Sequence, residues 1–214
     1  MAGNLNLQSL EFGSCFSYTP RPTSPDNTNL DLMKKTKDYT ILLKQDHMVH
    51  VKNEGDMPMT SYVVKIISKH FSTLPFADFF KDYTVLVPVP SSSLMTYDAL
   101  WVPRRIADAM VSVGIGNEVA PILKRSKSIP KSSISISSER PSPLMHYESL
   151  TAEPTIIDIH NVVLIDDVIT RGSTMIGCAN KLSDENPGLK IRGFSMIRTI
   201  HDAISIVACT PHSM

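Results

Sequence analysis

The chain has 214 residues, which is enough for one domain with a substantial buried core. Its 21 Lys and Arg residues equal its 21 Asp and Glu residues, so no global field attracts it to nucleic acid or to a membrane surface. Three scattered cysteines exclude a disulfide framework and a Cys-x-x-Cys zinc site. The start lacks a basic and apolar signal, and no run of 18 apolar residues occurs, so we expect a soluble, cytoplasmic protein.

The first 38 residues are rich in Asn, Ser, Thr and Pro, and they predict an irregular segment. Residues 39–43 and 48–51 then predict two strands that are joined by a tight turn. Polar residues at 60 and 61 indicate the start of a helix that continues to about residue 71, with an apolar face for packing on a sheet.

A β-rich run at residues 83–89 predicts the next strand, which ends in a loop of proline and serine. The loop residues are Pro90, Ser91 and Ser92. Free amide and hydroxyl groups in such a loop are suited to binding an anion, although Pro-Ser loops are also common on surfaces.

A helix is predicted from about Trp101, with Pro103 in its first turn. Arg104 and Arg105 therefore lie at the helix N-terminus, where two cations oppose the helix dipole. A shared anion such as a diphosphate would remove this conflict. The alternative is that both arginines are solvated and bind no ligand.

Residues 118–123 predict another short strand, and a long stretch without periodicity follows from 126 to 154. This stretch is dense in Ser, Pro and charged residues, including Arg140. A loop of this length inside a compact domain is usually functional.

The most informative stretch is 156–174. Residues 162–165 are β-branched or aliphatic without polar alternation, as expected of a parallel strand that is buried on both faces. Asp166 and Asp167 follow at the predicted end of this strand. A loop of mostly small residues comes next and opens a predicted helix at 175–182.

This order predicts a phosphate site. The crevice of an open parallel sheet lies outside the carboxyl ends of its strands, and a helix N-terminus there offers unpaired N–H groups to an anion. Gly172 lets the backbone approach the anion, and hydroxyls donate to it from Thr170, Ser173 and Thr174. The adjacent carboxylates are better suited to sugar hydroxyls or to a hydrated Mg²⁺. A P-loop ATPase is excluded, because the chain has no Gly-x-x-x-x-Gly-Lys-Ser/Thr motif.

Two further strands are predicted at 190–198 and 203–209, and Asn186-Pro-Gly188 ends the helix before them. The alternation of strands and helices from residue 83 onward predicts an α/β fold with a doubly wound, mainly parallel sheet and helices on both faces.

Residues 162–174, Val-Val-Leu-Ile-Asp-Asp-Val-Ile-Thr-Arg-Gly-Ser-Thr, resemble the phosphoribosyl pyrophosphate (PRPP) signature of type I phosphoribosyltransferases. Arg171 stands where that family usually has a second Thr. The resemblance implies a core at 81–214 with a mobile loop at 126–154, and a hood at 1–80 that selects the nucleophile. It also implies that PRPP and Mg²⁺ are used to transfer a phosphoribosyl group to a nitrogen nucleophile, most often a nucleobase, with release of pyrophosphate.

The resemblance further implies a role for each matching residue. Asp166 and Asp167 would be catalytic and would bind the metal, and Arg125 and Arg140 would stabilise the leaving diphosphate. The implied substrate-binding residues are Thr170, Arg171, Gly172, Ser173, Thr174, Pro90, Ser91, Ser92, Arg104 and Arg105.

Two alternatives share the same pocket. One is a regulator that senses PRPP or a nucleotide without turnover, as some relatives do. The other follows from a resemblance to ComF-type members at Leu123-Lys-Arg125 and Glu139-Arg140, and would be an accessory protein in DNA uptake or processing. The zinc-binding cysteines that often precede the ComF core are missing, and overall neutrality disfavours nucleic acid. Dimers are common among members of this family, so a homodimer is possible, but the sequence itself does not give the oligomeric state.

Overall fold

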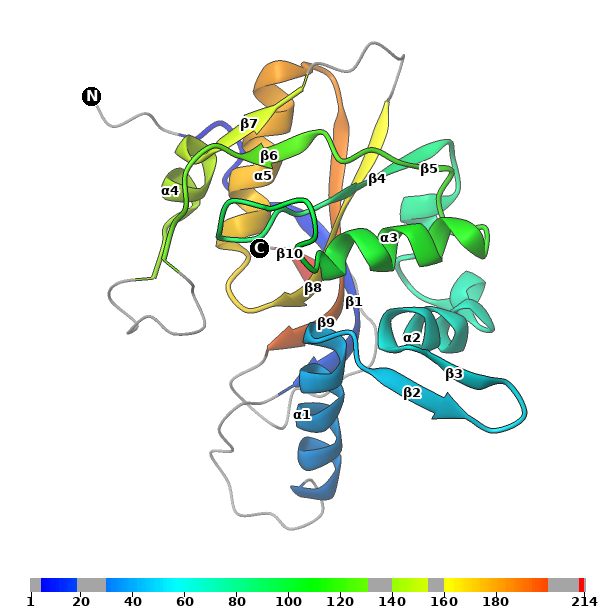
Figure 1. Ribbon diagram of the computed structural model, residues 1–214. Helices are drawn as coiled ribbons and strands as arrows, with labels where there is room; N and C mark the ends of the chain where they lie inside the picture. The colour runs from blue at the N-terminus through cyan, green and yellow to red at the C-terminus, as the bar shows by residue number, and fades with distance from the viewer. Residues whose placement is uncertain (1–4, 19–29, 131–139, 154–159, 200–211, 214) are drawn as a thin grey trace.

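A six-stranded sheet forms the centre of the computed structural model, which describes residues 5–18, 30–130, 140–153, 160–199 and 212–213 (Figure 1). The strands, in their order across the sheet, are β10 (His212–Ser213), β1 (Glu11–Tyr18), β9 (Lys190–Thr199), β8 (Asn161–Ile169), β4 (Thr84–Pro88) and β5 (Glu118–Val119). Five of them are parallel, and β10 is antiparallel to β1. The predicted α/β class with a mainly parallel sheet is confirmed.

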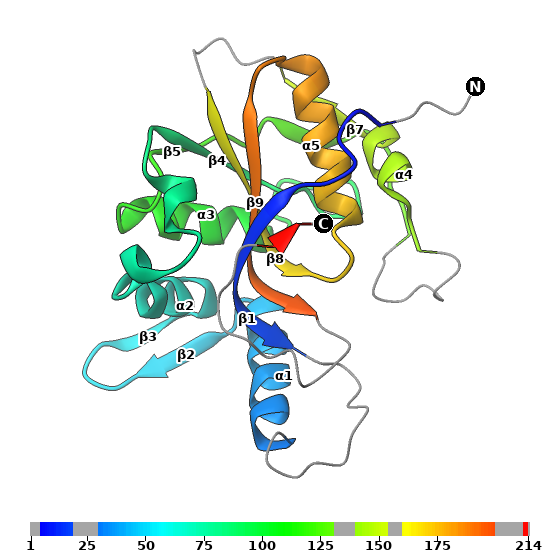
Figure 2. The same ribbon diagram turned by 180° about the vertical axis from the view of Figure 1, so that it is seen from behind.

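Helices cover both faces of the sheet, so the described part of the chain has three layers (Figures 1 and 2). One face carries α1 (Leu30–Lys44), α2 (Met59–Ser68) and α3 (Val102–Ser112), and the other carries α5 (Ser173–Glu185) with α4 (Pro143–Glu148) packed on it. Each face has its own buried apolar cluster, with Phe76 and Phe194 on the first and Leu164 and Met175 on the second. None of the helices in the described residues is long and apolar enough to cross a membrane.

Short elements complete the fold. Two 3-10 helices, η1 (Phe71–Thr73) and η2 (Ala77–Phe80), precede β4, and two small antiparallel sheets pair β2 (Met48–Val51) with β3 (Gly55–Pro58) and β6 (Leu123–Arg125) with β7 (Leu150–Ala152).

Strand β8 is the predicted central strand. It lies between β4 and β9, and its residues 162–165 are at most 2% exposed. The run of aliphatic side chains is therefore explained by burial on both faces of a parallel sheet. The predicted strand at 190–198 is confirmed as β9, and the strand predicted at 203–209 lies outside the described residues.

The N-terminal predictions were largely wrong. Residues 11–18 are not irregular but form β1, which runs parallel to β9 inside the central sheet. Residues 39–43 are not a strand but belong to the helix α1. The predicted strand at 48–51 is present as β2, but its partner is β3. The segment predicted as a hood at 1–80 thus contributes a strand to the sheet itself.

The long loop predicted at 126–154 also contains regular structure. The described residues include helix α4 and strand β7, and residues 131–139 lie outside the described part of the chain. Strand β7 pairs with β6, which is separate from β5, so residues 118–123 do not form one strand. Helix α4 packs against α5, and β7 also contacts α5.

Asp46 stabilises the start of α2 from outside the helix. The helix begins at Met59 and not at the predicted cap residues 60 and 61. The Thr60 N–H donates to the Asp46 carboxylate at 2.9 Å, and Arg105 donates to its second oxygen at 2.6 Å. Asp46 also holds a left-handed φ of 45°, which Asp and Asn tolerate better than other side chains.

We expect Asp46→Ala to lower the free energy of unfolding by about 1–3 kcal/mol, because the buried N–H of Thr60 loses its acceptor. Asp46→Asn keeps an acceptor oxygen and tolerance of positive φ, so it should lose less. Urea unfolding of both variants measures the difference. Equal stabilities for the alanine and asparagine variants would contradict this role.

Candidate functional site

The site lies where the sheet changes its direction of winding. From β4 the chain moves outward to β5, and it then returns to β8 on the other side of β4. Ligands of open α/β sheets bind at such a switch point, outside the carboxyl ends of the two strands. The loops that follow β4 and β8 are the predicted Pro-Ser loop at 90–92 and the predicted phosphate loop at 170–174.

The sequence predicted Asp166 and Asp167 at the end of the strand, but both lie within β8. The last pair between β4 and β8 joins Pro88 to Ile165, but β8 continues beside the longer β9 as far as Ile169. Side chains of adjacent residues in a strand point to opposite faces of the sheet, so the two carboxylates do not contact one ligand from the same side. Asp166 lines the pocket described next, and Asp167 is not among its lining residues.

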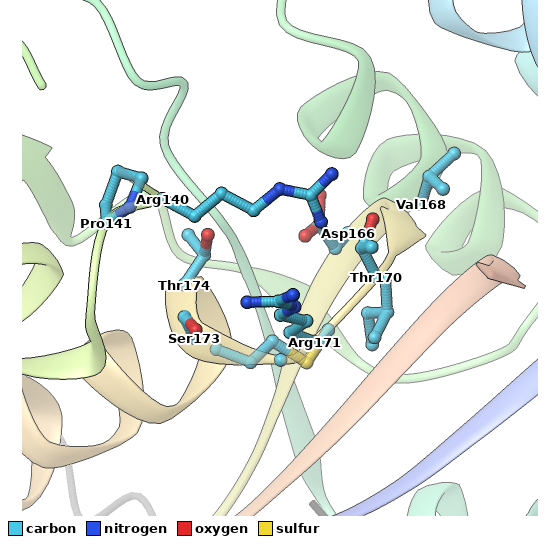
Figure 3. Close-up of a pocket in the computed structure, with 11 residues that line it drawn as sticks. Arg140, Pro141, Asp166, Val168, Thr170, Arg171, Ser173 and Thr174 are labelled. Atoms are coloured by element: carbon cyan, nitrogen blue, oxygen red, sulfur yellow. The ribbon is translucent and has the colours of Figure 1, made fainter. Parts of the chain in front are cut away.

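A pocket of about 90 Å³ opens at the start of α5 (Figure 3). A cavity of this size suits one small anionic group. All five predicted loop residues line it, together with Asp166 and Arg140. Gly172 precedes the helix with a φ of 75°, a conformation that glycine adopts without strain. The loop therefore presents the helix N-terminus to the pocket, as predicted.

Arg140 enters the pocket from the segment before α4. Figure 3 shows its side chain directed toward Asp166, and Pro141 beside it also lines the pocket. The Arg140 Nε atom is buried and has no hydrogen-bond partner within the described residues. Arg171, at the loop itself, is an exposed residue. A basic pocket next to a carboxylate is suited to an anion that is bound together with a cation or with hydroxyl groups.

Asp166 is held in an environment that disfavours its charge. Burial of the carboxyl group raises its pKa well above the ordinary value, and the negative charge of neighbouring Asp167 raises it further. The Asp167 N–H donates to Asp166 at 2.9 Å and opposes this effect, as does the charge of Lys44 at the end of α1. A carboxyl group with such a displaced pKa, in a pocket, is a candidate functional group.

Behind the pocket lies a buried group of polar side chains that the sequence did not reveal. His146 of α4 is 2% exposed, and its Nε2 atom lies 3.3 Å from the Thr174 hydroxyl of the phosphate loop. Burial, together with the positive charge of Arg125, lowers the His146 pKa to about 4, so this imidazole is neutral at neutral pH. The neutral ring is thus placed to orient the Thr174 hydroxyl.

The close packing of α4 on α5 depends on Gly177. A Cβ atom at this position would lie 2.6 Å from the Cβ of His146 and 2.8 Å from the backbone oxygen of Pro143.

One sequence signal could have revealed α4, since Ser142 followed by Pro143 is typical of a helix start. The Ser142 hydroxyl indeed accepts from the Met145 N–H at 3.2 Å.

Arg125 lies behind the pocket and not in its lining. It is 7% exposed, and it donates from Nε to the Ser91 carbonyl at 3.0 Å and from Nη1 to the Ser149 hydroxyl at 2.5 Å. Burial lowers its pKa, although it remains a cation in the neutral range. The guanidinium joins the loop after β4 to the end of α4. In this geometry Arg125 positions other groups rather than contacting a ligand in the pocket.

The Pro-Ser loop is ordered by such contacts. Pro90 is buried, Ser91 is exposed, and the Ser92 carbonyl accepts from the Ile129 N–H at 2.9 Å. None of these three residues lines the pocket at 170–174. The loop lies at the same edge of the sheet, because Val89 still hydrogen-bonds to Ile165 of β8.

Arg104 and Arg105 lie at the N-terminus of α3, as predicted, but each is paired with a carboxylate. Arg104 forms two hydrogen bonds of 2.9 Å to Asp108 one turn later, and Arg105 bonds to the buried Asp46. These ion pairs offset the conflict with the helix dipole without a bound anion. Neither arginine lines the pocket.

Two comparisons with known proteins identified no relative of the chain. A scan with models of known protein families found no match to the chain, and a search of curated proteins found none either.

Proposed function

We propose that the protein is a phosphoribosyltransferase, which uses PRPP to transfer a phosphoribosyl group to a nitrogen nucleophile and releases pyrophosphate. The observation that carries the proposal is the pocket at 170–174, where a helix N-terminus, three hydroxyl-bearing residues and Arg140 face Asp166 at the switch point. A doubly wound fold of the type I phosphoribosyltransferase kind belongs to the same proposal, and the parallel sheet with helices on both faces supports it.

Each part of the pocket suits a part of PRPP. The backbone and hydroxyls at 170–174 would bind the 5-phosphate, and Asp166 would accept hydrogen bonds from the ribose hydroxyls. Bond breaking between C1 and oxygen builds negative charge on the leaving diphosphate, which a preorganised cation stabilises best. Arg140, which lines the pocket, would supply this cation, and Arg125 donates to the Ser91 carbonyl of the neighbouring loop.

The donor atoms also suit a magnesium ion bound with the substrate. No group of three or more His, Cys, Asp or Glu side chains able to hold a metal occurs in the described part of the chain. Mg²⁺ usually binds through one or two carboxylates plus substrate phosphates, so Asp166 would be sufficient, and Asp167, which points to the other face of the sheet, would not bind the ion directly. When bound, the ion would neutralise part of the diphosphate charge, and its positive charge would favour the ionised form of Asp166.

The accessory role in DNA binding receives less support. It relied on a local basic stretch at 124–140, but Lys124 forms an ion pair with Glu153 and Arg125 is buried. A cation that is paired or buried is less available to a phosphate, so two of the five basic residues of this stretch are poorly suited to binding DNA.

Pyrophosphate release from PRPP with Mg²⁺, measured over a panel of purines, pyrimidines and small amines, tests the proposal. We expect release that depends on one acceptor, and its loss in Asp166→Asn/Asp167→Asn, because Asp166 no longer offers a carboxylate to the ribose and the metal. Asp82→Asn, at the amino end of β4, is the matched control and should retain the activity.

Two results would contradict the enzyme. PRPP binding in calorimetry without release for any acceptor would favour the sensing regulator, which uses the same pocket. No PRPP binding at all would mean that the pocket serves a different anion and that Arg171, in place of the usual Thr, alters the choice of ligand.

A further inference from the structure

A second pocket lies at the carboxyl edge of the sheet, where α1 stands beside the ends of β1 and β9 (Figures 1 and 2). Its volume is about 250 Å³. The walls come from α1, α2 and the two strands, and the residues used below are Phe16, Lys35, Tyr39, Tyr62, Ile66 and Ile197. None of the sequence motifs identified this site, because its residues come from four separate segments.

The pocket keeps large apolar side chains in contact with solvent. Phe16 is 43% exposed, Tyr39 48% and Ile66 41%, and all three line the same cavity. Single exposed apolar residues are ordinary, but a contiguous apolar group around a cavity usually marks a binding site. The base of the cavity belongs to the main apolar core, which includes Leu43, Met59, Val63, Met196 and Ile197, and Tyr62 packs against that core.

The size of the cavity limits the ligand. A dry apolar cavity of roughly 150 Å³ is enough to bind benzene, whereas sites for drug-sized ligands begin at roughly 300 Å³. A volume of about 250 Å³ therefore suits one aromatic ring with a small substituent. Tyr39, Tyr62 and Phe16 offer ring faces and edges for contact with such a molecule.

The polar groups of the walls limit its chemistry. Lys35 is the one charged residue in the lining, and no carboxylate of the described residues pairs with it. A nucleobase carries donors and acceptors around much of its ring, and apolar walls would leave several of them without partners. A ring with a single anionic group has its polar end at Lys35 and its apolar part against the walls.

We propose that this pocket binds a small molecule with one aromatic ring and one carboxylate. The site adjoins the phosphate pocket, because Ile197 of this cavity pairs across the sheet with Val168, which lines the other one. The proposal that this cavity binds such a molecule does not depend on the proposed function. The further proposal that the molecule is the acceptor of the phosphoribosyl group does rest on that function, and the acceptor would then be an aromatic acid with a nitrogen nucleophile and not a nucleobase.

In that reaction the nitrogen forms a bond to C1 of the ribose while the C1–O bond to the diphosphate breaks. The diphosphate leaves with the electron pair of that bond, and the proton of the nitrogen passes to water. No oxidant or reductant is needed.

Binding of 4-methylbenzoate, its neutral amide, adenine and uracil, measured by NMR titration at constant ionic strength, tests the proposal. We expect the acid to bind roughly fivefold more tightly than the amide, which is the effect of an exposed ion pair. Lys35→Gln should remove this preference, and Ile66→Trp should abolish binding of both by filling the cavity. Lys37→Gln, on the same helix but outside the lining, should change neither.

Tighter binding of a nucleobase than of the acid, or binding that Ile66→Trp leaves intact, would overturn the proposal. So would a dimer in sedimentation that Ile66→Trp dissociates, since a second copy would then occupy the cavity. PRPP binding is measured on the same samples. If the wild-type protein binds PRPP but not the acid, only the aromatic-acid site is rejected. If it binds the acid but not PRPP, only the phosphoribosyltransferase is rejected.

Discussion

Replacement of Arg140 by methionine is expected to slow pyrophosphate release by about 10²–10³-fold, the usual effect of removing one preorganised donor to developing negative charge. The side chain lines the phosphate pocket, points toward Asp166, and has a buried Nε without a partner in the described residues. A donor that is desolvated and unpaired before the ligand arrives pays little reorganisation when the charge develops. The measurement is single-turnover release with saturating PRPP.

Two further variants separate charge from geometry. Arg140→Lys keeps the cation but loses the planar pair of donors, so it should recover part of the rate and not all of it. Lys190→Met removes one cation at the amino end of β9. The pocket lies at the carboxyl ends of the strands, so this variant should leave the rate unchanged. Equal rates for Arg140→Met and the wild type would remove Arg140 from the site.

The central strand and the phosphate loop were predictable because their signals are local. An aliphatic run without alternation has few explanations other than a buried strand, and Gly172 with its hydroxyl neighbours stands directly before a helix. Only the end of the strand was misplaced. Pairing with β9 extends β8 through Asp166 and Asp167, and that pairing is not visible in the sequence of β8 alone.

Strand β1 was missed because it has no aliphatic run: small and polar residues separate its three aromatic ones. Gly13 leaves space for Phe76, whose ring lies within 2.6 Å of the position that a Cβ atom would take. Ser14 and Cys15 are also buried, so burial on both faces occurs here without the usual aliphatic run. In α1 the opposite error occurred: residues 39–43 favour a strand by propensity, but the packing of Leu43 in the core requires a helix there.

The supporting residues of the site could not be predicted, because they act over long separations in the chain. Arg125 reaches the Ser91 carbonyl, and Thr174 meets His146 across the contact of α4 with α5. Local patterns predicted the loop at 170–174 that lines the pocket. They do not predict which buried side chains hold that segment in place, since these contacts arise only when the layers pack.

The buried His146 leads to a prediction about stability and pH. Its pKa is about 4 in the folded protein and 6.5 in an unfolded chain, so between these values the unfolded state binds a proton that the folded state excludes. The free energy of unfolding therefore falls as the pH is lowered through this window. The displacement corresponds to about 3 kcal/mol, or roughly 6–12 °C in Tm for a chain of this size.

His146→Gln removes this titration and leaves the acidic groups in place. We expect the stability difference between the wild type and the variant to shrink by about 3 kcal/mol between pH 7.5 and pH 3.5, in urea unfolding at four or five pH values. His70→Gln, at an exposed position, should keep the wild-type dependence. Parallel curves for the wild type and His146→Gln would mean that protonated His146 is tolerated in the fold. Below about pH 6.5 the Thr174 hydroxyl would then face a protonated ring, which can only donate to it.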